Sequence, residues 1–263
     1  MYDFEFLRPT TLDDAVAALK DEDAQALGGG QTLLPTMKAR LAAPETLVSL
    51  TAIPEMQGVC MTDDGQLEIG GATTHGEIAK AAQESYPGLA SLAGRIGDPA
   101  VRARGTIGGS LANNDPSACW PAVALASGAT IVTNAREIAA DDFFQGMFDT
   151  ALDESEIIVS VRFPVPEASA YEKLPQPASR FPLVAAFVAK FSDGVRVAIT
   201  GASGDGVFRW SAAEEALSAD FDPDAVDGLS LDADDMIADI HGSQSYRAHL
   251  CGVMTKRAVK AAS

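Results

Sequence analysis

Apolar and polar positions alternate with two different periods in the first part of the chain. In residues 10–20 the apolar side chains recur at helical spacing, and either Thr10 or Thr11 is placed to cap the helix. Residues 3–9 alternate as a strand does, and residues 46–50 form a short run rich in β-branched side chains. The first fifty or so residues therefore predict a small βαβ-like unit.

A second α+β unit is predicted from about Ile53 onward. Residues 65–82 have the pattern of a hairpin strand followed by a helix, and residues 86–109 predict a second helix that leads into a glycine-rich loop. Residues 121–133 begin as a helix and end as a strand, and residues 153–166 form a strand closed by two prolines.

The C-terminal third has a pattern of its own. A Pro-rich segment at residues 164–177 predicts a domain junction. Residues 182–204 alternate as two antiparallel strands joined at Asp193-Gly194, and residues 245–262 form an amphipathic helix. The glycines of "GASGDG" lack the order of a dinucleotide-binding loop and predict a turn.

The amino-acid composition predicts a folded protein without a membrane-spanning segment. The 263 residues are 47% hydrophobic, without an apolar run long enough for a membrane helix, and the acidic start lacks the pattern of a signal peptide. We expect a folded cytoplasmic protein of one to three domains with no transmembrane segment. The three cysteines at positions 60, 119 and 251 are widely separated, so any metal cluster is expected in another chain.

The charge balance excludes two kinds of partner. A formal net charge of −18 disfavours nucleic acid and anionic membranes, both of which favour clustered Lys and Arg. Every charged residue from Ala212 to Asp239 is acidic, and this segment is interpreted as a solvated face with loops rather than a metal site.

Two glycine-rich loops are the first candidates for chemistry. Gly28, Gly29 and Gly30 can adopt positive φ and let their N–H groups converge on an anion, or they can form a mobile turn. About eighty residues later, residues 106–110 again place two glycines between hydroxyl-bearing side chains. Two such loops can surround the two phosphates of a dinucleotide, although neither has the Rossmann or Walker spacing.

Five segments in order resemble one family over nearly the whole chain. "GGGQTLLPTMKARLAAPETLVSL" and "IGDPAVRARGTIGGSLANNDPSACWP" resemble its two loops, and "LDESEIIVSVRFPVP", "YEKLPQPASRF" and "SQSYRAHLCGVMTKRAV" resemble its later motifs. The chain is thereby identified as similar to the FAD-binding medium subunits of molybdenum hydroxylases, the family of carbon monoxide dehydrogenase and xanthine dehydrogenase.

The resemblance implies an α+β fold. A two-subdomain FAD-binding domain of the PCMH type, like that of vanillyl-alcohol oxidase, would span residues 1–167, with subdomains at about 1–53 and 54–167. A C-terminal α+β domain of antiparallel sheet plus helices would span residues 168–263.

The resemblance also implies the residues that bind FAD. The diphosphate would lie against the two loops, Ile158 by the flavin, and Lys173 and Phe181 near the isoalloxazine; no catalytic or metal residue is implied. The full set is Gly28, Gly29, Gly30, Gln31, Thr32, Leu33, Thr106, Ile107, Gly108, Gly109, Ser110, Asp115, Cys119, Ile158, Lys173 and Phe181.

Some positions depart from the family pattern or allow another interpretation. Gly28 stands where the family has alanine, and Thr32 stands where it commonly has serine. Phe181 stands where the carbon monoxide enzymes have tyrosine, and Cys119 stands where the family has an acid that is expected to hydrogen-bond FAD. Lys173 is either a flavin contact or a surface lysine, and the side chains that serve either binding or loop geometry are Asp98, Arg102, Arg104 and Asp115. His75 is interpreted as a turn or helix-cap residue rather than a base.

The implied function is an electron relay. FAD can join a one-electron iron–sulfur chain to a two-electron acceptor. The implied partners are a large molybdenum-cofactor subunit and a small [2Fe–2S] subunit, assembled as a dimer of heterotrimers, with quinone, NAD or O2 as the open choice of acceptor. The alternatives are a free-standing FAD-dependent oxidase or dehydrogenase, and a flavin-free assembly module.

Overall fold

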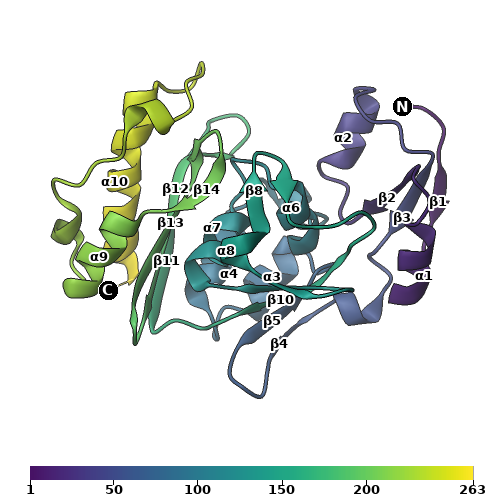
Figure 1. The fold of residues 1–263 in the computed structure, drawn as a ribbon, viewed down its shortest axis with the longest axis horizontal. Coiled ribbons are helices and arrows are strands. Elements are labelled where there is room, and N and C mark those ends of the chain that lie inside the picture. The colour runs from purple at the N-terminus through teal and green to yellow at the C-terminus, as the bar shows by residue number, and fades with distance from the viewer. Residues whose placement is uncertain (263) are drawn as a thin grey trace.

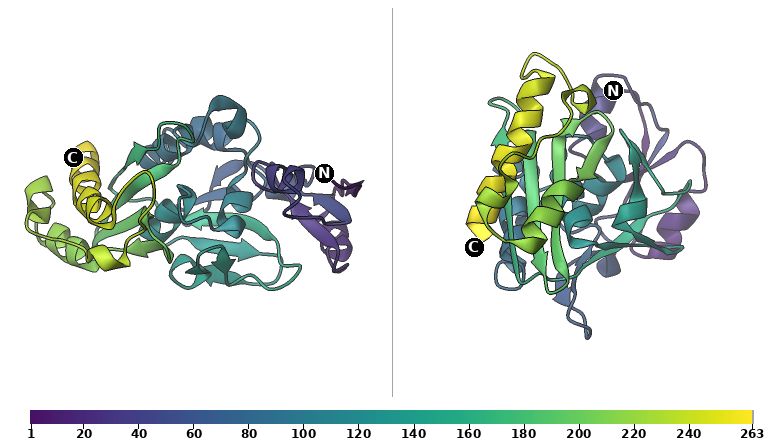
Figure 2. Two further views of the ribbon diagram at one scale, coloured as in Figure 1. Left: turned by 90° about the horizontal axis from the view of Figure 1, so that it is seen from above. Right: turned by 60° about the vertical axis from the view of Figure 1, so that its left-hand side comes forward.

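The computed structural model describes residues 1–262, which form three larger β-sheets with helices packed around them (Figure 1). The sheets follow one another along the long axis of the molecule, with the N-terminal unit at one end and the C-terminal helices at the other (Figure 2). No helix within residues 1–262 is both long and apolar enough to cross a membrane.

The N-terminal unit is a small parallel sheet with strand order β1-β3-β2. Parallel neighbours need crossover connections, which helices α1 and α2 supply. The hydroxyl of Thr11, rather than that of Thr10, caps α1 by accepting from the N–H of Asp14. The elements in chain order are β1 (Glu5–Leu7), α1 (Leu12–Ala18), β2 (Ala24–Leu27), α2 (Leu33–Lys38) and β3 (Thr46–Ser49).

The central unit is built on a five-stranded antiparallel sheet with order β4-β5-β10-β6-β7. The predicted strands in residues 65–82, 121–133 and 153–166 are β5, β6 and β10, which lie next to one another in this sheet. The strands are β4 (Val59–Met61), β5 (Leu67–Gly70), β6 (Thr130–Thr133), β7 (Glu137–Ala139) and β10 (Ile158–Phe163), with a separate two-stranded ribbon of β8 (Phe144–Gly146) and β9 (Asp149–Thr150). The helices of this unit are η1 (Pro54–Met56), α3 (His75–Ala81), α4 (Pro87–Gly94), α5 (Pro99–Arg102), α6 (Ile107–Asn113), α7 (Trp120–Ser127) and α8 (Ala140–Phe143).

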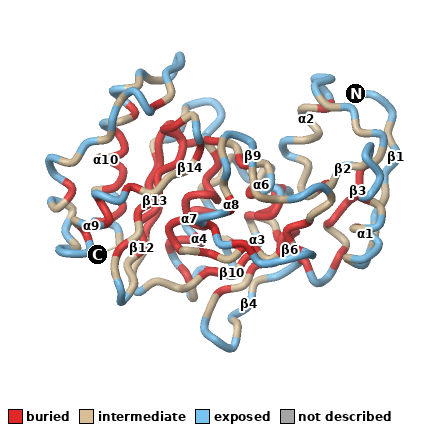
Figure 3. Tube along the Cα trace, in the orientation of Figure 1, coloured by how far each residue is buried: buried red, intermediate tan, exposed pale blue. Residues whose placement is uncertain are grey.

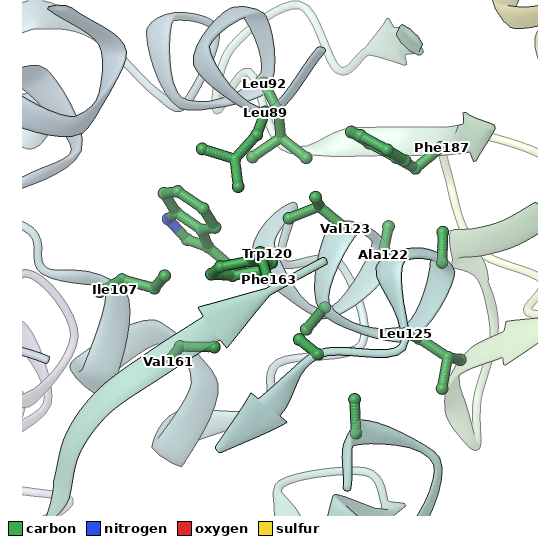
Figure 4. Close-up of a cluster of buried hydrophobic side chains, with 14 of the residues drawn as sticks. Leu89, Leu92, Ile107, Trp120, Ala122, Val123, Leu125, Val161, Phe163 and Phe187 are labelled. Atoms are coloured by element: carbon green, nitrogen blue, oxygen red, sulfur yellow. The ribbon is translucent and has the colours of Figure 1, made fainter. Parts of the chain in front are cut away.

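Helix α7 occupies the middle of the molecule, and every one of its residues is buried (Figure 3). Its side chains Trp120 and Val123 lie between β10 and α4, and Leu125 points away from α4 (Figure 4). The same cluster includes Phe187 of the C-terminal sheet. The core therefore continues across residue 167. The domain boundaries at residues 53 and 167 stay predictions from the sequence.

The C-terminal unit is a four-stranded antiparallel sheet with order β11-β12-β13-β14. Helix α10 packs on one face and α7 on the other. The hairpin at Asp193-Gly194 is confirmed as the link between β12 and β13. The elements are β11 (Ala168–Pro175), β12 (Pro182–Phe191), β13 (Gly194–Ser203), β14 (Gly206–Arg209), α9 (Ser211–Ala219), η2 (Pro223–Val226), η3 (Ala233–Asp235) and α10 (Gln244–Ala262).

Two expectations from the sequence need correction here. The Pro-rich segment 164–177 is more than a junction, because it contains strand β11. This strand lies at the edge of its sheet, where its last residue, Pro175, is tolerated although proline has no N–H to donate to a neighbouring strand. The acidic segment is not wholly solvated either. Glu214 is buried, accepts from the N–H of Val197, and forms an ion pair with Arg209 at 2.6 Å.

Candidate functional site

A cleft of about 540 Å³ runs between the N-terminal sheet, the central unit and the start of β12. Its walls include both glycine-rich segments, which we call the first loop (residues 28–32) and the second loop (residues 105–110). The volume lies within the range of small-molecule and cofactor sites.

The first loop packs directly against the second. A Cβ atom at Gly29 would lie 1.8 Å from the carbonyl oxygen of Arg104, and one at Gly28 would lie 2.6 Å from Oγ1 of Thr106. The glycines at 28 and 29 are therefore required by contact between two segments of chain. Of these three glycines, only Gly30 has a positive φ, at +69°, so the expectation that all three could use left-handed backbone is corrected.

The first loop also carries unused hydrogen-bond donors. Within residues 1–262, none of the main-chain N–H groups of residues 28–32 donates to a protein acceptor. The hydroxyl of Thr32, directly before helix α2, makes no hydrogen bond with the described chain either. Consecutive free N–H groups beside a cleft form the kind of concavity that binds anionic oxygens.

The second loop differs, because protein acceptors already occupy its main-chain donors except the N–H of Thr106. The N–H of Ile107 donates to the carbonyl of Thr73, and that of Gly108 to the carbonyl of Gly71. The N–H of Gly109 donates to the hydroxyl of Thr106, which caps helix α6. This loop therefore offers the cleft the side chain of Ser110 and the exposed Cα of Gly109, where an added Cβ would meet only Oγ1 of Thr106 at 3.1 Å, rather than a row of amides.

The loop that follows α6 places two polar residues with different tasks. Asp115 lines the cleft and accepts from the N–H of Ser117 at 2.8 Å, so its carboxylate also shapes the turn. Asn114 has a left-handed backbone and is buried, and its amide donates to the carbonyls of Gly146 and Asp149. Asn114 thereby anchors the β8–β9 ribbon beside the site.

Cys119 and Lys173 form a pair at the inner end of the cleft. The thiol of Cys119 lines the cleft and lies 3.8 Å from Nζ of Lys173. Lys173 is only 7% exposed and donates to the carbonyls of Arg95 (2.6 Å) and Arg180 (3.0 Å), so the surface-lysine interpretation is wrong. Burial lowers the pKa of the Lys173 ammonium, while the neighbouring Cys119 acts in the opposite direction.

Tyr171 lies behind the same pair. Its hydroxyl is buried and makes no hydrogen bond with residues 1–262. Burial raises the pKa of this phenol, and its proximity to Cys119 adds to the effect, so the hydroxyl stays protonated.

Ile158 and Phe181 line the cleft from two different sheets. Ile158 begins strand β10 and is buried, whereas Phe181 precedes β12 and is 46% exposed. The loop that carries Phe181 is held by Lys173 through Arg180, whose backbone has a φ of +62°. An exposed ring beside an opening is available to pack against a planar group.

His75 lies on the wall of the cleft, and the sequence interpretation of it needs correction. The cap of helix α3 is Thr74, which forms a reciprocal capping box with Glu77. His75 follows the cap, is buried, and accepts a hydrogen bond at Nδ1 from the indole Nε1–H of Trp120 at 3.0 Å. Little in the sequence indicated that His75 belongs to the cleft, since neither glycine-rich loop is near it along the chain.

Asp98 and Arg102, which precede the second loop, each make their own hydrogen bonds to nearby main chain. Asp98 caps helix α5, and Arg102 donates to the carbonyls of Ile96 and Gly97. None of the salt bridges of residues 1–262 joins Asp98 to Arg102 or Arg104.

Most of the sequence-predicted residues line the cleft together. The two exceptions are Ile107, which is buried in the core (Figure 4), and Lys173, which lies behind Cys119. The cleft also includes residues that the sequence did not indicate, chiefly Gly71, His75, Leu152, Glu156, Ser179 and Arg180.

Comparison with known proteins gives consistent matches. Residues 2–166 match the sequence family described as FAD binding domain in molybdopterin dehydrogenase. The chain is 34% identical to the carbon monoxide dehydrogenase medium chain of Hydrogenophaga pseudoflava, covering 98% of this chain and 96% of that one. It is 32% identical to the nicotine 6-hydroxylase medium subunit of Paenarthrobacter nicotinovorans, covering 97% and 95%. A structure of reconstituted CO dehydrogenase from Oligotropha carboxidovorans superposes with a TM-score of 0.90 at 31% identity, covering 100% and 99%.

Proposed function

Because this chain belongs to the family of FAD-binding domains of molybdopterin dehydrogenases, we propose that it passes electrons from [2Fe–2S] clusters of a small partner subunit to an external acceptor. The family resemblance, the α+β fold and the FAD cofactor predicted from the sequence are confirmed by the comparisons. The chain is thus the FAD subunit of an oxidoreductase of the molybdenum hydroxylase type.

The names of its relatives support the assembly. Two are called medium chain or medium subunit, and one solved relative is described as a Cu,Mo-CO dehydrogenase. For this chain we propose a large molybdenum-cofactor subunit and a small [2Fe–2S] subunit as partners, in a dimer of heterotrimers. Substrate oxidation would then take place in the large subunit.

The observation that carries the proposal is the row of unused N–H groups at residues 28–32. These donors face a cleft whose second wall is the loop that ends in Ser110. A diphosphate supplies the acceptor oxygens that such donors need, and charge-assisted bonds to them are strong. We assign the diphosphate of FAD to this wall, with the hydroxyls of Thr32 and Ser110 as additional donors.

The other end of the cleft suits the flavin ring. Ile158 offers an apolar surface and Phe181 an exposed ring, and Cys119 provides a polar atom between them. Bound there, FAD supplies the ability to exchange electrons singly or in pairs. The residues of this chain hold and orient the cofactor, and Lys173 holds the Phe181 loop in place from behind.

Reconstitution of the complex tests the proposal. The isolated chain loaded with FAD is expected to be bleached by dithionite, to be reoxidised by an acceptor, and to remain oxidised when substrates of the related hydroxylases are added. Addition of both partner subunits should make the flavin band respond to substrate in stopped-flow absorbance. Bleaching of the lone chain by substrate would instead support a free-standing dehydrogenase.

A further inference from the structure

The side chain of His75 is buried where the second loop begins. It is 4% exposed, and a Cβ atom at Gly105 would lie 2.7 Å from its Nε2. The main-chain N–H of His75 donates to the carbonyl of Gly105 at 2.9 Å, so histidine and loop are held together. His75 lines the same cleft as the free amides of the first loop.

Trp120 determines which nitrogen of His75 carries the proton. An indole Nε1–H can only donate, and it donates to Nδ1 of His75 at 3.0 Å. Nδ1 is therefore unprotonated, and a neutral ring must hold its proton on Nε2. Burial, with the nearby Arg102 guanidinium, lowers the pKa of His75 to about 4, which keeps the ring neutral at physiological pH.

The Nε2–H group of His75 has no acceptor within residues 1–262. Nε2 is not among the fully enclosed, unpartnered side-chain atoms of residues 1–262, so this donor keeps access to the cleft, where a ligand can supply the acceptor. The Arg102 guanidinium adds positive charge to this wall and is itself fixed by the carbonyls of Ile96 and Gly97. An anionic oxygen can both accept a hydrogen bond from the Nε2–H of His75 and be attracted by the positive charge of Arg102.

We propose that the Nε2–H of His75 donates to a phosphate oxygen of the FAD diphosphate, and that Trp120 acts as a positioning residue that fixes the required tautomer. This inference rests on the proposed location of FAD in the cleft. It assigns the missing donor of the second wall to a side chain outside both glycine loops, because the main-chain amides of the second loop are largely used within the protein.

Binding measurements on three variants test the assignment. His75→Leu is expected to weaken both FAD and ADP about tenfold, whereas riboflavin, which has no phosphate, should bind as in the unmodified chain. His75→Gln keeps a side-chain N–H and should recover part of the loss. Trp120→Phe keeps an aromatic ring but releases Nδ1, so a smaller loss of about threefold is expected. Far-UV CD of each apo-protein checks the fold.

Nitrogen-15 NMR of the unmodified chain provides a test that needs no substitution. We expect the Nε2–H tautomer of His75 in the apo-protein and a shift of this resonance when ADP is added. A proton on Nδ1, an unchanged resonance with ADP, or equal ADP affinity of His75→Leu and the unmodified chain would overturn the assignment alone. Failure of the unmodified chain to bind FAD would overturn the location of FAD as well.

Discussion

A Cβ atom at Gly29 would lie 1.8 Å from the carbonyl oxygen of Arg104, so the first loop packs against the residue that directly precedes the second loop. The contact separates two roles that glycine has in this site. At position 29 it permits main chain to pack against main chain, whereas at position 109 it lines the cleft and an added Cβ would meet only the hydroxyl oxygen of Thr106 at 3.1 Å.

Substitutions at the two positions are therefore expected to have different effects. Gly29→Ala should destabilise the protein by about 2–3 kcal/mol, because a methyl group would overlap a main-chain carbonyl. Gly109→Val should destabilise the protein less, by about 1 kcal/mol, because the added Cβ would crowd only the hydroxyl oxygen of Thr106, and it should weaken FAD at least tenfold. Urea unfolding and fluorescence titration with FAD measure the two quantities.

Gly252→Ala is the matched control for both glycine variants. It lies in helix α10, where an added Cβ would meet only Trp210 at 3.9 Å. We expect it to stabilise the chain by up to about 1 kcal/mol and to leave FAD binding unchanged. Full FAD affinity in Gly109→Val would be incompatible with the diphosphate location that we propose.

Cys119→Asp is expected to tighten FAD about fivefold. A carboxylate would offer acceptors to the Lys173 ammonium and to the Tyr171 hydroxyl, which makes no hydrogen bond within residues 1–262. It would still have lone pairs left to accept a hydrogen bond from FAD, and one net hydrogen bond contributes about 1 kcal/mol to binding. FAD fluorescence titration measures the change, and Cys119→Ala should differ from the unmodified chain by less than twofold. Weaker binding by the Asp variant would count against a polar contact here.

Lys173→Met should destabilise the protein by about 2 kcal/mol. The substitution leaves the carbonyls of Arg95 and Arg180 without their donor, and relief of the buried ammonium offsets only part of that cost. Chemical unfolding followed by circular dichroism measures the loss. Lys20→Met, at an exposed position, is the control and should be close to neutral. Equal stability of the two variants would contradict the anchoring role.

The buried His75 predicts a specific dependence of stability on pH. Its pKa falls from 6.5 to about 4 on folding, so between these values the unfolded state binds more protons than the native state. Stability therefore rises with pH across this window and is lost as the pH falls from 6.5 toward 4. Between pH 7 and pH 5 the loss from this group is about 2 kcal/mol.

A comparison with His75→Gln isolates that contribution. The variant lacks the titrating group, so its unfolding free energy should fall by about 2 kcal/mol less between pH 7 and pH 5 than that of the unmodified chain. Urea unfolding of both proteins in the same buffers cancels the effect of the many surface carboxylates. Parallel pH profiles would show that His75 is not buried as a neutral ring.

The sequence predicted the long elements well because their periodicity is a local property. Strands β12 and β13 alternate over ten residues each, and the turn between them follows from Asp193-Gly194. Strands such as β8 and β9 have three and two residues, too few to show a period. Strand β2 was missed for the same reason, because its four residues are mostly small or polar.

The sequence indicated most of the residues that the structure brings together along the cleft, but not which of their hydrogen-bond donors are already used within the protein. Whether the amides of the second loop are free depends on acceptors at Gly71 and Thr73, more than thirty residues earlier in the chain. The partner of His75 lies 45 residues away at Trp120. Such pairings arise only when the chain folds, so residue types and spacing alone cannot indicate them.

Helix α7 has a practical consequence for work with fragments of this protein. One of its sides is covered by the central unit and another by the C-terminal sheet, and its core cluster includes residues on both sides of position 167. A fragment ended at that position would expose to water the side of α7 that the C-terminal sheet covers, and α7 is apolar at every position except Ser127, so aggregation is the expected result. The predicted domain boundary is therefore a poor place to divide the chain for expression, and the two parts should melt together as one cooperative unit.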